Sequence, residues 1–419
     1  MRHSLILAKN MRLKGYLLSE ILGCTLRPSS DPLLTIAFDA KRYFNNATGL
    51  GFYSRTLLEG LRRFYPDHQY LLYTPYNRGK WATAADQIRL PDSWLGRMFH
   101  PLWRSSGITA QLQHDGVEVF HGLSHELPTG LRRVGIRSVV TMHDLIFMRY
   151  PDLYPSIDRI FYEKKYRRAA EEADCVVAIS EQTRADLEHF FNIPAQKVRI
   201  IGQSCDATFA RLSLRKQPNH MALPRSLGEN IPTSDYLIAV GSLTPRKNWH
   251  KLLDALFLLK NQGLKIPLVA VGTGKSAYAK ALRIQAEQLD IHTFWLDEFV
   301  TTKELAGLYR RAAALVYPSV FEGFGIPILE ALTVGIPVVT TRGGCFEEVG
   351  GPAALYASTN DVEDLAHQIA RVLEPDVRAE LISKMPAQVE KFSPQRISSA
   401  WMEVYGGQMA LRSLKDSAG

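Results

Sequence analysis

The chain has 419 residues, which is longer than a single hydrophobic core usually grows, so two domains are expected. Hydrophobic residues make up 46% of it and charged residues 22%, a composition that excludes a disordered or fibrous protein. The formal net charge of +8 favours an anionic partner, such as a nucleotide diphosphate or a lipid phosphate. Nucleic acid is the least favoured anion, because the sequence carries no lysine run, zinc-ligand spacing or nucleic-acid module.

The four cysteines are widely spaced and form no CxxC pair, which predicts free thiols in a reducing compartment such as the cytoplasm. No apolar run approaches the roughly 20 residues that a membrane-spanning helix needs. Residues 1–32 have short apolar pieces broken by charges, which makes a poor signal peptide. We interpret them as an N-terminal extension, with a basic arm at the inner face of the membrane as the alternative.

The first strand is predicted at residues 33–39, and an amphipathic helix at 50–65 follows it. Gly49 and Gly51 lie in the TGLGFY turn between them, which is either a phosphate loop or an ordinary helix start. It is not the dinucleotide fingerprint, because Ser54 replaces the third glycine.

A second strand at 70–74 leads into a segment, 76–109, that we predict to be irregular. The segment mixes aromatic residues with arginines, which is typical of an interfacial or acceptor-side surface, or else of a small satellite core.

Three histidines follow the next two predicted strands, 117–122 and 138–144. They are His121, His125 and His143. Residues at the carboxyl ends of parallel strands face the ligand crevice of an α/β domain, and histidine handles protons near neutral pH. Core or capping positions are the alternative, and we expect at least one of the three to face the cleft.

A basic helix is predicted at 157–173, where it could dock on anionic lipid or simply be solvated. Strands follow at 176–180 and 197–203. The polar, proline-containing residues 212–233 then show no periodicity and are predicted to link the two domains.

The second half opens with a strand at 236–241, followed by Arg246 and Lys247 in the sequence GSLTPRKN and a helix at 249–261. Two adjacent cations at the carboxyl end of a strand suit a phosphate site. A later strand, 267–274, ends in GTGKS, but Val269 stands where a nucleotide-hydrolase phosphate loop requires glycine.

A glycine-rich turn comes after the apolar strand 314–318, and it lies between two acidic residues. Glu322 precedes the turn and Glu330 lies in the helix that follows. The residues between them predict a sharp turn and a helix start, whose free N–H groups bind anions. The candidate donor-binding residues of this turn are Gly323, Phe324, Gly325, Ile326 and Pro327.

The FEGFGIPILEAL segment resembles the signature of the retaining glycosyltransferases of family 4, and GSLTPRKN resembles their second signature. The resemblance covers about residues 35–405. It implies the GT-B fold: two Rossmann-like, doubly wound parallel-sheet α/β domains facing a cleft. In the family the first glutamate contacts the donor sugar, the second contacts the ribose hydroxyls, and the cations and loop amides hold the diphosphate.

This resemblance implies an N-terminal acceptor-side domain at 33–211, a nucleotide-sugar-binding domain at 234–393, and a last segment, 394–419, whose helix crosses back to the first domain. The N-domain loop with Gly49 and Gly51 would also bind the donor. The family usually shows a Pro-x-Gly segment where this chain has Gly202-Gln203-Ser204 before Cys205 and Asp206.

The implied reaction moves a hexose from a nucleoside diphosphate sugar to a saccharide or lipid-linked acceptor with retention, in cell-surface polysaccharide synthesis. The nucleotide sugar is a co-substrate, and we expect no cofactor and no metal, since fixed cations can stabilise the diphosphate. The HDL and YPDLYP phrases favour GDP-mannose as donor.

Two alternatives come from other functional classes. A glycoside hydrolase could use Glu322 and Glu330 as its pair of carboxylates. A non-catalytic module could bind a sugar or a nucleotide without turnover.

Overall fold

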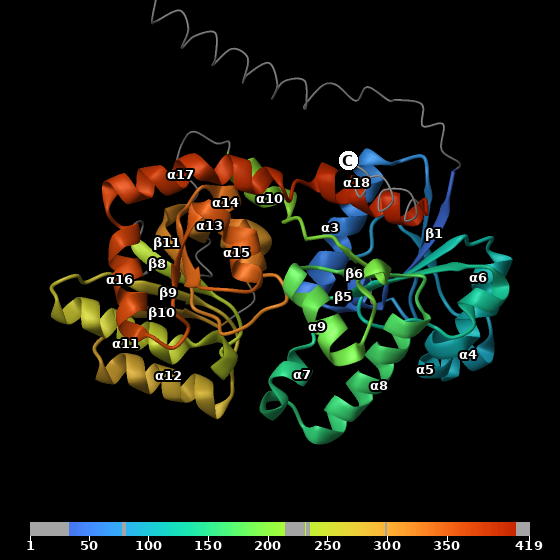
Figure 1. Ribbon diagram of the computed structural model, residues 1–419, viewed down its shortest axis with the longest axis horizontal. Coiled ribbons are helices and arrows are strands. Elements are labelled where there is room, and N and C mark those ends of the chain that lie inside the picture. Colours follow the sequence, from blue (N-terminus) through green and yellow to red (C-terminus); the bar gives the residue numbers. More distant parts are fainter. Residues whose placement is uncertain (1–32, 78–80, 214–230, 232–234, 298–299, 408–419) are drawn as a thin grey trace, which may run out of the picture. The chain divides into compact units, whose positions relative to one another are not determined.

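The strands of the protein form two separate parallel sheets, shown in Figure 1. The structure is a computed structural model, and it describes residues 33–77, 81–213, 231, 235–297 and 300–407. Among these residues the first sheet has seven strands in the order β3-β2-β1-β4-β5-β6-β7, and the second has six in the order β10-β9-β8-β11-β12-β13. In both sheets the strand order reverses at the first strand of the sheet, which confirms the predicted doubly wound α/β architecture.

The first sheet and its helices are built from the N-terminal half of the chain. The strands are β1 (Thr35–Asp39), β2 (Gln69–Tyr73), β3 (Gln87–Arg89), β4 (Val119–Gly122), β5 (Arg137–Met142), β6 (Cys175–Ala178) and β7 (Val198–Ile200). The helices are α2 (Lys41–Asn45), α3 (Gly49–Phe64), α4 (Trp94–Met98), α5 (His100–Leu102), α6 (Ile108–His114), α7 (Ile146–Arg149), α8 (Ser156–Glu172) and α9 (Glu181–Phe191). Helix α10 (Ala207–Ser213) follows β7 in the chain but packs with the helices of the second sheet. A π-helical turn, η1 (Trp103–Gly107), joins α5 to α6.

The second sheet follows the same alternation of strand and helix. The strands are β8 (Tyr236–Val240), β9 (Leu268–Val271), β10 (Thr293–Leu296), β11 (Ala312–Tyr317), β12 (Val338–Thr341) and β13 (Ala354–Ala357). The helices are α11 (Trp249–Asn261), α12 (Ala277–Gln288), α13 (Thr302–Arg311), α14 (Ile326–Val334), α15 (Cys345–Gly350), α16 (Val362–Val372), α17 (Pro375–Glu390) and α18 (Pro394–Tyr405). A short 3-10 helix, η6 (Pro245–Lys247), precedes α11.

Sequence reasoning was wrong about one long segment and overlooked several short elements and two longer helices. The segment 76–109, predicted to be irregular, contains β3, α4, α5 and η1. The elements that were not predicted are α2, α7, α10, α12, β10, β13 and α17. Strands of three or four residues are fixed by pairing with neighbouring strands rather than by their own periodicity, and Pro386 interrupts the helical pattern inside α17.

The last helix of the described residues, α18, packs on the first half of the chain. Trp401 and Tyr405 are buried there, and the Trp401 ring lies 4.4 Å from the His121 ring at the end of β4. On the neighbouring α3, Gly60 leaves room for this helix, since a Cβ there would lie 2.6 Å from Oγ of Ser398. The predicted extension 1–32 and most of the predicted linker 212–233 lie outside the described residues.

Candidate functional site

The glycine-rich turn after β11 forms the start of helix α14. Gly325 has φ +92°, a left-handed conformation that glycine adopts readily, and Pro327 lies in the first helical turn. The first N–H groups of this nine-residue helix therefore have no partner within the helix and give its end a partial positive charge. Glu322 lies just before this end and Glu330 lies inside the helix, as predicted.

Only the backbone of this turn is available to a ligand at several of the predicted positions. The Phe324 side chain is buried and contacts the Phe392 ring, and Ile326 packs against the hydrophobic core around the second sheet. Gly323 is restricted by a close approach, because a Cβ there would lie 2.0 Å from the carbonyl oxygen of His143. The turn thus offers main-chain groups rather than side chains.

Arg246 and Lys247 lie in η6, directly after the second sheet's first strand. Lys247 is placed over the Tyr317 ring, 4.7 Å from its centroid, and its Nζ donates a hydrogen bond of 2.6 Å to the Tyr317 hydroxyl. Arg246 donates to the carbonyl of Phe321 in the turn before α14. Both cations are therefore held against β11 and its loop, as a shared site requires.

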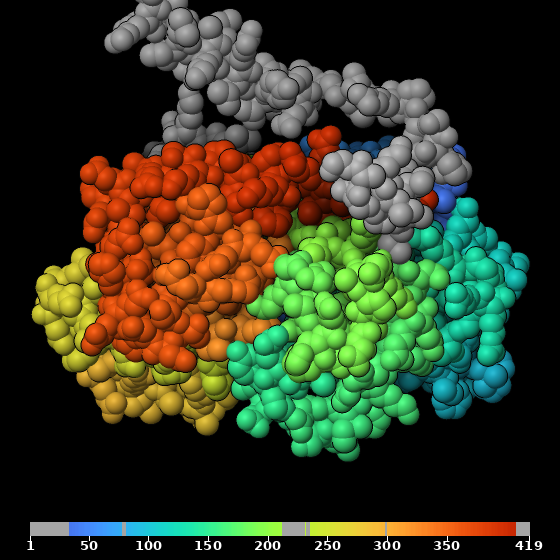
Figure 2. Space-filling model, viewed as in Figure 1, coloured from blue at the N-terminus to red at the C-terminus, as the bar shows by residue number. Residues whose placement is uncertain are grey.

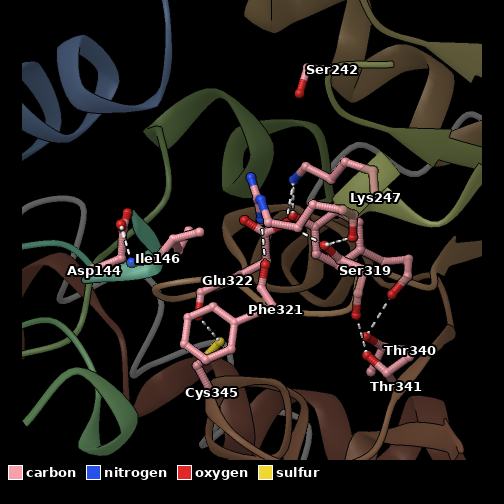
Figure 3. Close-up of polar contacts among 12 residues, drawn as sticks. Asp144, Ile146, Ser242, Lys247, Ser319, Phe321, Glu322, Thr340, Thr341 and Cys345 are labelled. Carbon is pink, nitrogen blue, oxygen red and sulfur yellow. Dashed lines mark hydrogen bonds and ion pairs between the residues drawn. The ribbon is translucent and has the colours of Figure 1, made fainter. Parts of the chain in front are cut away.

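Glu322 joins these cations into one cluster (Figure 3). Its Oε1 lies 2.6 Å from Nη1 of Arg246 and 2.6 Å from Nζ of Lys247, and it accepts a hydrogen bond of 2.5 Å from Ser319. Burial alone would raise the pKa of Glu322, but the attraction of Lys247 and Arg246 outweighs it and lowers this pKa to about 2. The carboxylate is charged at any working pH.

Glu330 has the opposite electrostatic character. Burial raises its pKa to about 7, although the Tyr309 hydroxyl, which donates a hydrogen bond of 3.1 Å, favours the charged form. Near neutral pH both the protonated and the charged form of this carboxyl are therefore populated. A group in this state can donate a hydrogen bond as well as accept one, which suits contact with a hydroxyl.

The structure separates the three predicted histidines. His121 is fully buried, with Nδ1 2.8 Å from the Tyr405 hydroxyl and Nε2 2.7 Å from Oγ1 of Thr141. Both ring nitrogens are satisfied by the protein and Trp401 covers the ring, so His121 does not face a cleft. Sequence reasoning could not see this, because the covering helix lies more than two hundred residues further along the chain.

His125 and His143 lie together, with ring centroids 5.2 Å apart. His125 has φ +63° and stacks on Tyr166, and its buried Nδ1 has no hydrogen-bond partner within the described part of the chain. Nε2 of His143 lies 2.8 Å from the carbonyl oxygen of Leu123. Because a carbonyl oxygen only accepts, Nε2 carries the proton and donates this hydrogen bond. Burial lowers the pKa of both, that of His143 to about 4, so both are neutral at pH 7.

The predicted N-domain glycines differ in their surroundings. Gly49 is the first residue of α3, and a Cβ there would meet no atom within 4 Å. Gly51 is buried, and a Cβ there would lie 2.0 Å from the carbonyl oxygen of Asn46. Glycine at 51 is thus explained by the close packing of this turn on itself, and only Gly49 borders open space.

Several residues that support the cluster were not found by sequence reasoning. Tyr317 and Ser319 orient Lys247 and Glu322, while Nε2 of Gln182 and Sγ of Cys345 donate to the carbonyl of Glu322, at 2.9 and 3.2 Å. Tyr317, Gln182 and Cys345 meet partners from distant positions in the sequence, so no local pattern marks them. Ser319 stands only three residues before Glu322, and its place in the same turn is the one signal that could have found it.

The arrangement as a whole can hold an anion. It combines two partly buried cations, with side chains 19% and 11% exposed, a helix N-terminus and a carboxylate at the carboxyl end of a parallel sheet, where open α/β sheets bind ligands. Within the described residues, no group of three or more His, Cys, Asp and Glu side chains is placed to hold a metal ion. Of the helices in that part of the chain, none has the length and apolar character needed to cross a bilayer.

Two protein-family models match the chain and together cover most of it. The model described as "Glycosyltransferase Family 4" matches residues 47–209, and the model described as "Glycosyl transferases group 1" matches residues 228–391. Each match falls on one of the two sheets, and the second contains Arg246, Lys247, Glu322 and Glu330.

The curated relatives include several bacterial mannosyltransferases. The chain is 29% identical over 300 residues to "O-antigen chain mannosyltransferase B" of Escherichia coli, which covers 68% of this chain and 74% of the relative. It is 28% identical over 228 residues to "O-antigen chain mannosyltransferase RfbU" of Salmonella typhimurium, covering 53% of this chain and 57% of the relative.

Solved structures share the fold at low sequence identity. A glycosyltransferase from Rickettsia africae has a TM-score of 0.66 at 16% identity, covering 91% of this chain and 99% of that one. The lipopolysaccharide glycosyltransferase WaaG has a TM-score of 0.65 at 18% identity, covering 89% and 100%. Anabaena HepE in complex with UDP and glucose has a TM-score of 0.66 at 17% identity, covering 89% and 100%.

Proposed function

Because the chain belongs to the group 1 glycosyltransferases of the GT-B fold, we propose that it transfers a hexose from a nucleoside diphosphate sugar to a hydroxyl acceptor, with retention at the anomeric carbon. One observation carries the proposal. Arg246, Lys247 and Glu322 form a single ion-paired cluster beside the N-terminus of α14. Such a cluster has the charge and position to hold a diphosphate while a carboxylate contacts the sugar.

Catalysis then rests on stabilising the leaving diphosphate. Negative charge develops on this group as the glycosidic bond breaks, and Arg246, Lys247 and the first amides of α14 are already in place to bind it. Each such contact contributes roughly 2.7–4 kcal/mol to lowering the barrier, taking one oxyanion-hole donor as the guide. Fixed cations perform the task that a divalent metal performs in other transferases, so we propose a metal-independent reaction.

The remaining acidic group and the histidines serve binding and proton handling in this proposal. Glu330, with its pKa near 7, contacts the ribose hydroxyls of the donor. Of the three histidines only His125 and His143 remain candidates for the reaction, and both act as neutral imidazoles. We assign no catalytic part to His121.

The relatives supply the proposed donor and pathway class. The names of the curated relatives favour mannose, with GDP-mannose as donor, and an acceptor that is a growing cell-surface polysaccharide or its lipid-linked precursor. HepE, with its UDP and glucose, makes UDP-glucose the main competitor. A thermal-shift panel of nucleotide sugars distinguishes them, and we expect GDP-mannose to stabilise the protein most.

The direct test is a transfer assay with the preferred nucleotide sugar and a polysaccharide-derived acceptor, in the presence of a chelator. We expect a product whose new linkage has the anomeric configuration of the donor. An inverted product would refute retention, and complete dependence on added metal would refute the metal-independent reaction. Binding of nucleotide sugar without any turnover would leave only the binding-module alternative.

The geometry argues against the hydrolase alternative. The separated pKa values of Glu322 and Glu330 resemble an acid–base pair, but two cations and Ser319 hold Oε1 of Glu322, and this charge pairing makes the carboxylate a weak nucleophile. Release of nitrophenol from a nitrophenyl mannoside without nucleotide would overturn this conclusion.

A further inference from the structure

Three consecutive residues of the turn before α14 contact the first half of the chain. The rings of Phe321 and Tyr150, the residue after α7, have centroids 5.5 Å apart. The carbonyl oxygen of Glu322 accepts a hydrogen bond of 2.9 Å from Nε2 of Gln182 on α9. Gly323 packs closely on the main chain that follows β5. The first half therefore holds the main chain at Glu322, whereas the carboxylate of this residue pairs with cations of the second half.

The Gln182 side chain belongs to the first turn of α9, and a carboxylate of the second half holds that turn. Glu348, on α15, accepts hydrogen bonds from the main-chain N–H groups of Glu181, at 3.0 Å, and Gln182, at 3.3 Å. The hydroxyl of Ser180 accepts from the N–H of Thr183 at 3.1 Å. The first three N–H groups of α9, which have no partner inside a helix, are thus all satisfied, and two of them depend on the other half.

Helix α15 is fixed by contacts with its own half. On α17, the buried Gln388 donates through Nε2 to the carbonyl oxygens of Glu348, at 2.8 Å, and Val349, at 2.9 Å. At the start of α15, Sγ of Cys345 donates to the carbonyl oxygen of Glu322 at 3.2 Å. Helix α15 therefore contacts both the start of α9 and the turn before α14.

Helices α9 and α15 meet closely at a glycine. A Cβ at Gly344, the residue just before α15, would lie 1.8 Å from Oε1 of Gln182. In Figure 2 the green atoms around α9 meet the orange atoms around α15, and Figure 1 labels both helices. The amide of Gln182 is therefore held in one orientation, with its oxygen toward Gly344 and its nitrogen toward the carbonyl of Glu322.

The position of the Glu322 main chain becomes important when a diphosphate binds. The diphosphate competes with the Glu322 carboxylate for Arg246 and Lys247, so the carboxylate has to leave its ion pairs. It then moves only by rotation about the bonds of its own side chain, because Gln182 holds the main chain. A reacting group misplaced by about 1 Å can cost a factor of about 100 in rate.

We propose that Gln182 and Glu348 are positioning residues for the transfer reaction. Glu348 holds the start of α9, and Gln182 fixes the main chain at Glu322, so that the released carboxylate meets the transferred sugar. The inference rests on the proposed function, because it takes Glu322 to contact the sugar. Transfer then requires contact between the two halves, whereas nucleotide binding does not, since Arg246 and Lys247 both belong to the second half.

The first test is Gln182→Leu, which removes the donated hydrogen bond with little change in side-chain size. We expect kcat for sugar transfer to fall about 10- to 100-fold, as it does for a misplaced reacting group. The Kd for GDP or UDP, measured by calorimetric titration, should stay within about twofold of that of the unaltered protein. An unchanged kcat, or a loss of nucleotide affinity as large as the loss of kcat, would overturn the proposal.

The second test changes the other half, so it does not depend on whether Gln182→Leu folds. Glu348→Gln weakens the contact with α9, and kcat should fall about tenfold while the Kd for GDP or UDP stays the same. Glu347→Gln is the matched control, because this exposed neighbour on α15 carries the same charge and contacts Gly343 of its own loop. Equal effects of the two variants on kcat would refute the role of Glu348.

A double variant tests whether the two residues act through the same carbonyl. Gln182→Leu combined with Glu348→Gln should be no more than about twofold slower than Gln182→Leu alone, because the second change has no hydrogen bond to Glu322 left to disturb. Effects that multiply would show independent roles and contradict the proposal. Absence of transfer by the unaltered protein would refute the proposed function and this inference with it. Unchanged kcat in the variants of an active protein would refute the positioning role alone.

Discussion

The two charged sites of this protein satisfy their cations in different ways. At the carboxyl end of the second sheet, Arg246 and Lys247 share the carboxylate of Glu322, and Ser319 and Tyr317 complete the hydrogen bonds. A cavity of the first half, between η1 and α8, is lined by three cations and two carboxylates: Arg104, Lys165, Arg168, Asp39 and Glu126. Nε of Arg104 and Nε of Arg168 are buried without an acceptor among the described residues.

The two sites differ in whether an incoming anion must displace an existing ion pair. A diphosphate entering the second-sheet site has to compete with Glu322 for the two cations, so its binding is coupled to a rearrangement of this carboxylate. An anion entering the first cavity displaces no ion pair of Arg168 within the described residues. We therefore expect single substitutions in the first cavity to leave the fold intact. Ligand binding at the second site should instead depend on Arg246, Lys247 and Glu322 together.

The largest expected effect comes from removing the shared carboxylate. Glu322→Gln should lower the rate of transfer by about 100- to 1000-fold. It should also lower the free energy of unfolding by roughly 1–3 kcal/mol, since two partly buried cations lose their counter-charge. Transfer assays and urea unfolding measure the two effects. Glu172→Gln, an exposed position at the end of α8, is the control, and an equally small effect of both variants would contradict the coupling of the three charges.

Removing one of the cations should weaken nucleotide binding without abolishing the fold. Lys247→Ala should weaken GDP or UDP binding by roughly 10- to 100-fold, as expected for loss of a charged hydrogen bond. Calorimetric titration measures this. Lys275→Ala is the control, because this exposed lysine lies in the GTGKS segment that lacks the glycine of a true phosphate loop. A larger effect at Lys275 would move the phosphate site to that segment.

The buried carboxyl of Glu330 should make stability depend on pH. Between its ordinary value of 4.5 and about 7, the folded chain keeps a proton that the unfolded chain releases, so stability falls as pH rises through this window. Glu330→Gln removes this dependence, and its stability relative to the unaltered protein should increase from pH 5 to pH 8. Urea midpoints at the two pH values measure it, and an unchanged difference would show that Glu330 titrates normally.

The smallest effect on activity is expected at the hydrogen bond beneath the last helix. Tyr405→Phe leaves Nδ1 of His121 unsatisfied and should cost about 1–3 kcal/mol of stability while the rate per folded molecule stays the same. Adding His121→Phe should recover part of this loss, because both polar partners are then gone. A fall in transfer rate without a fall in stability would instead place His121 in the reaction.

Sequence reasoning predicted those parts of the site that are local in the chain. The residues from Gly323 to Pro327 predict a turn and a helix start by themselves. The strand before Arg246 is a continuous apolar run, so both sheets and both signatures could be recognised. The ion pair of Glu322 with Arg246 and Lys247 could not be predicted, because it depends on two loops that meet only when β8 and β11 pair.

Other features could not be predicted because they combine distant segments. The cavity in the first half takes its charged residues from β1, η1, the loop after β4, and α8, and no periodicity marks them as neighbours. His121 looked like the other strand-end histidines, and only the return of α18 distinguishes it. Local chemistry predicts where a strand ends, but not which later segment will cover that end.

The way α18 completes the first core restricts how the protein can be divided. A fragment ending near residue 213 would expose Phe38 and His121 to water, because Trp401 and Tyr405 normally cover them. The two halves are therefore interlocked through α18, and an independently expressed first half would require residues 394–405 grafted onto it. Truncations or bulky fusions placed just before α18 should therefore disturb the N-terminal half of the enzyme, although that half lies furthest from α18 in the sequence.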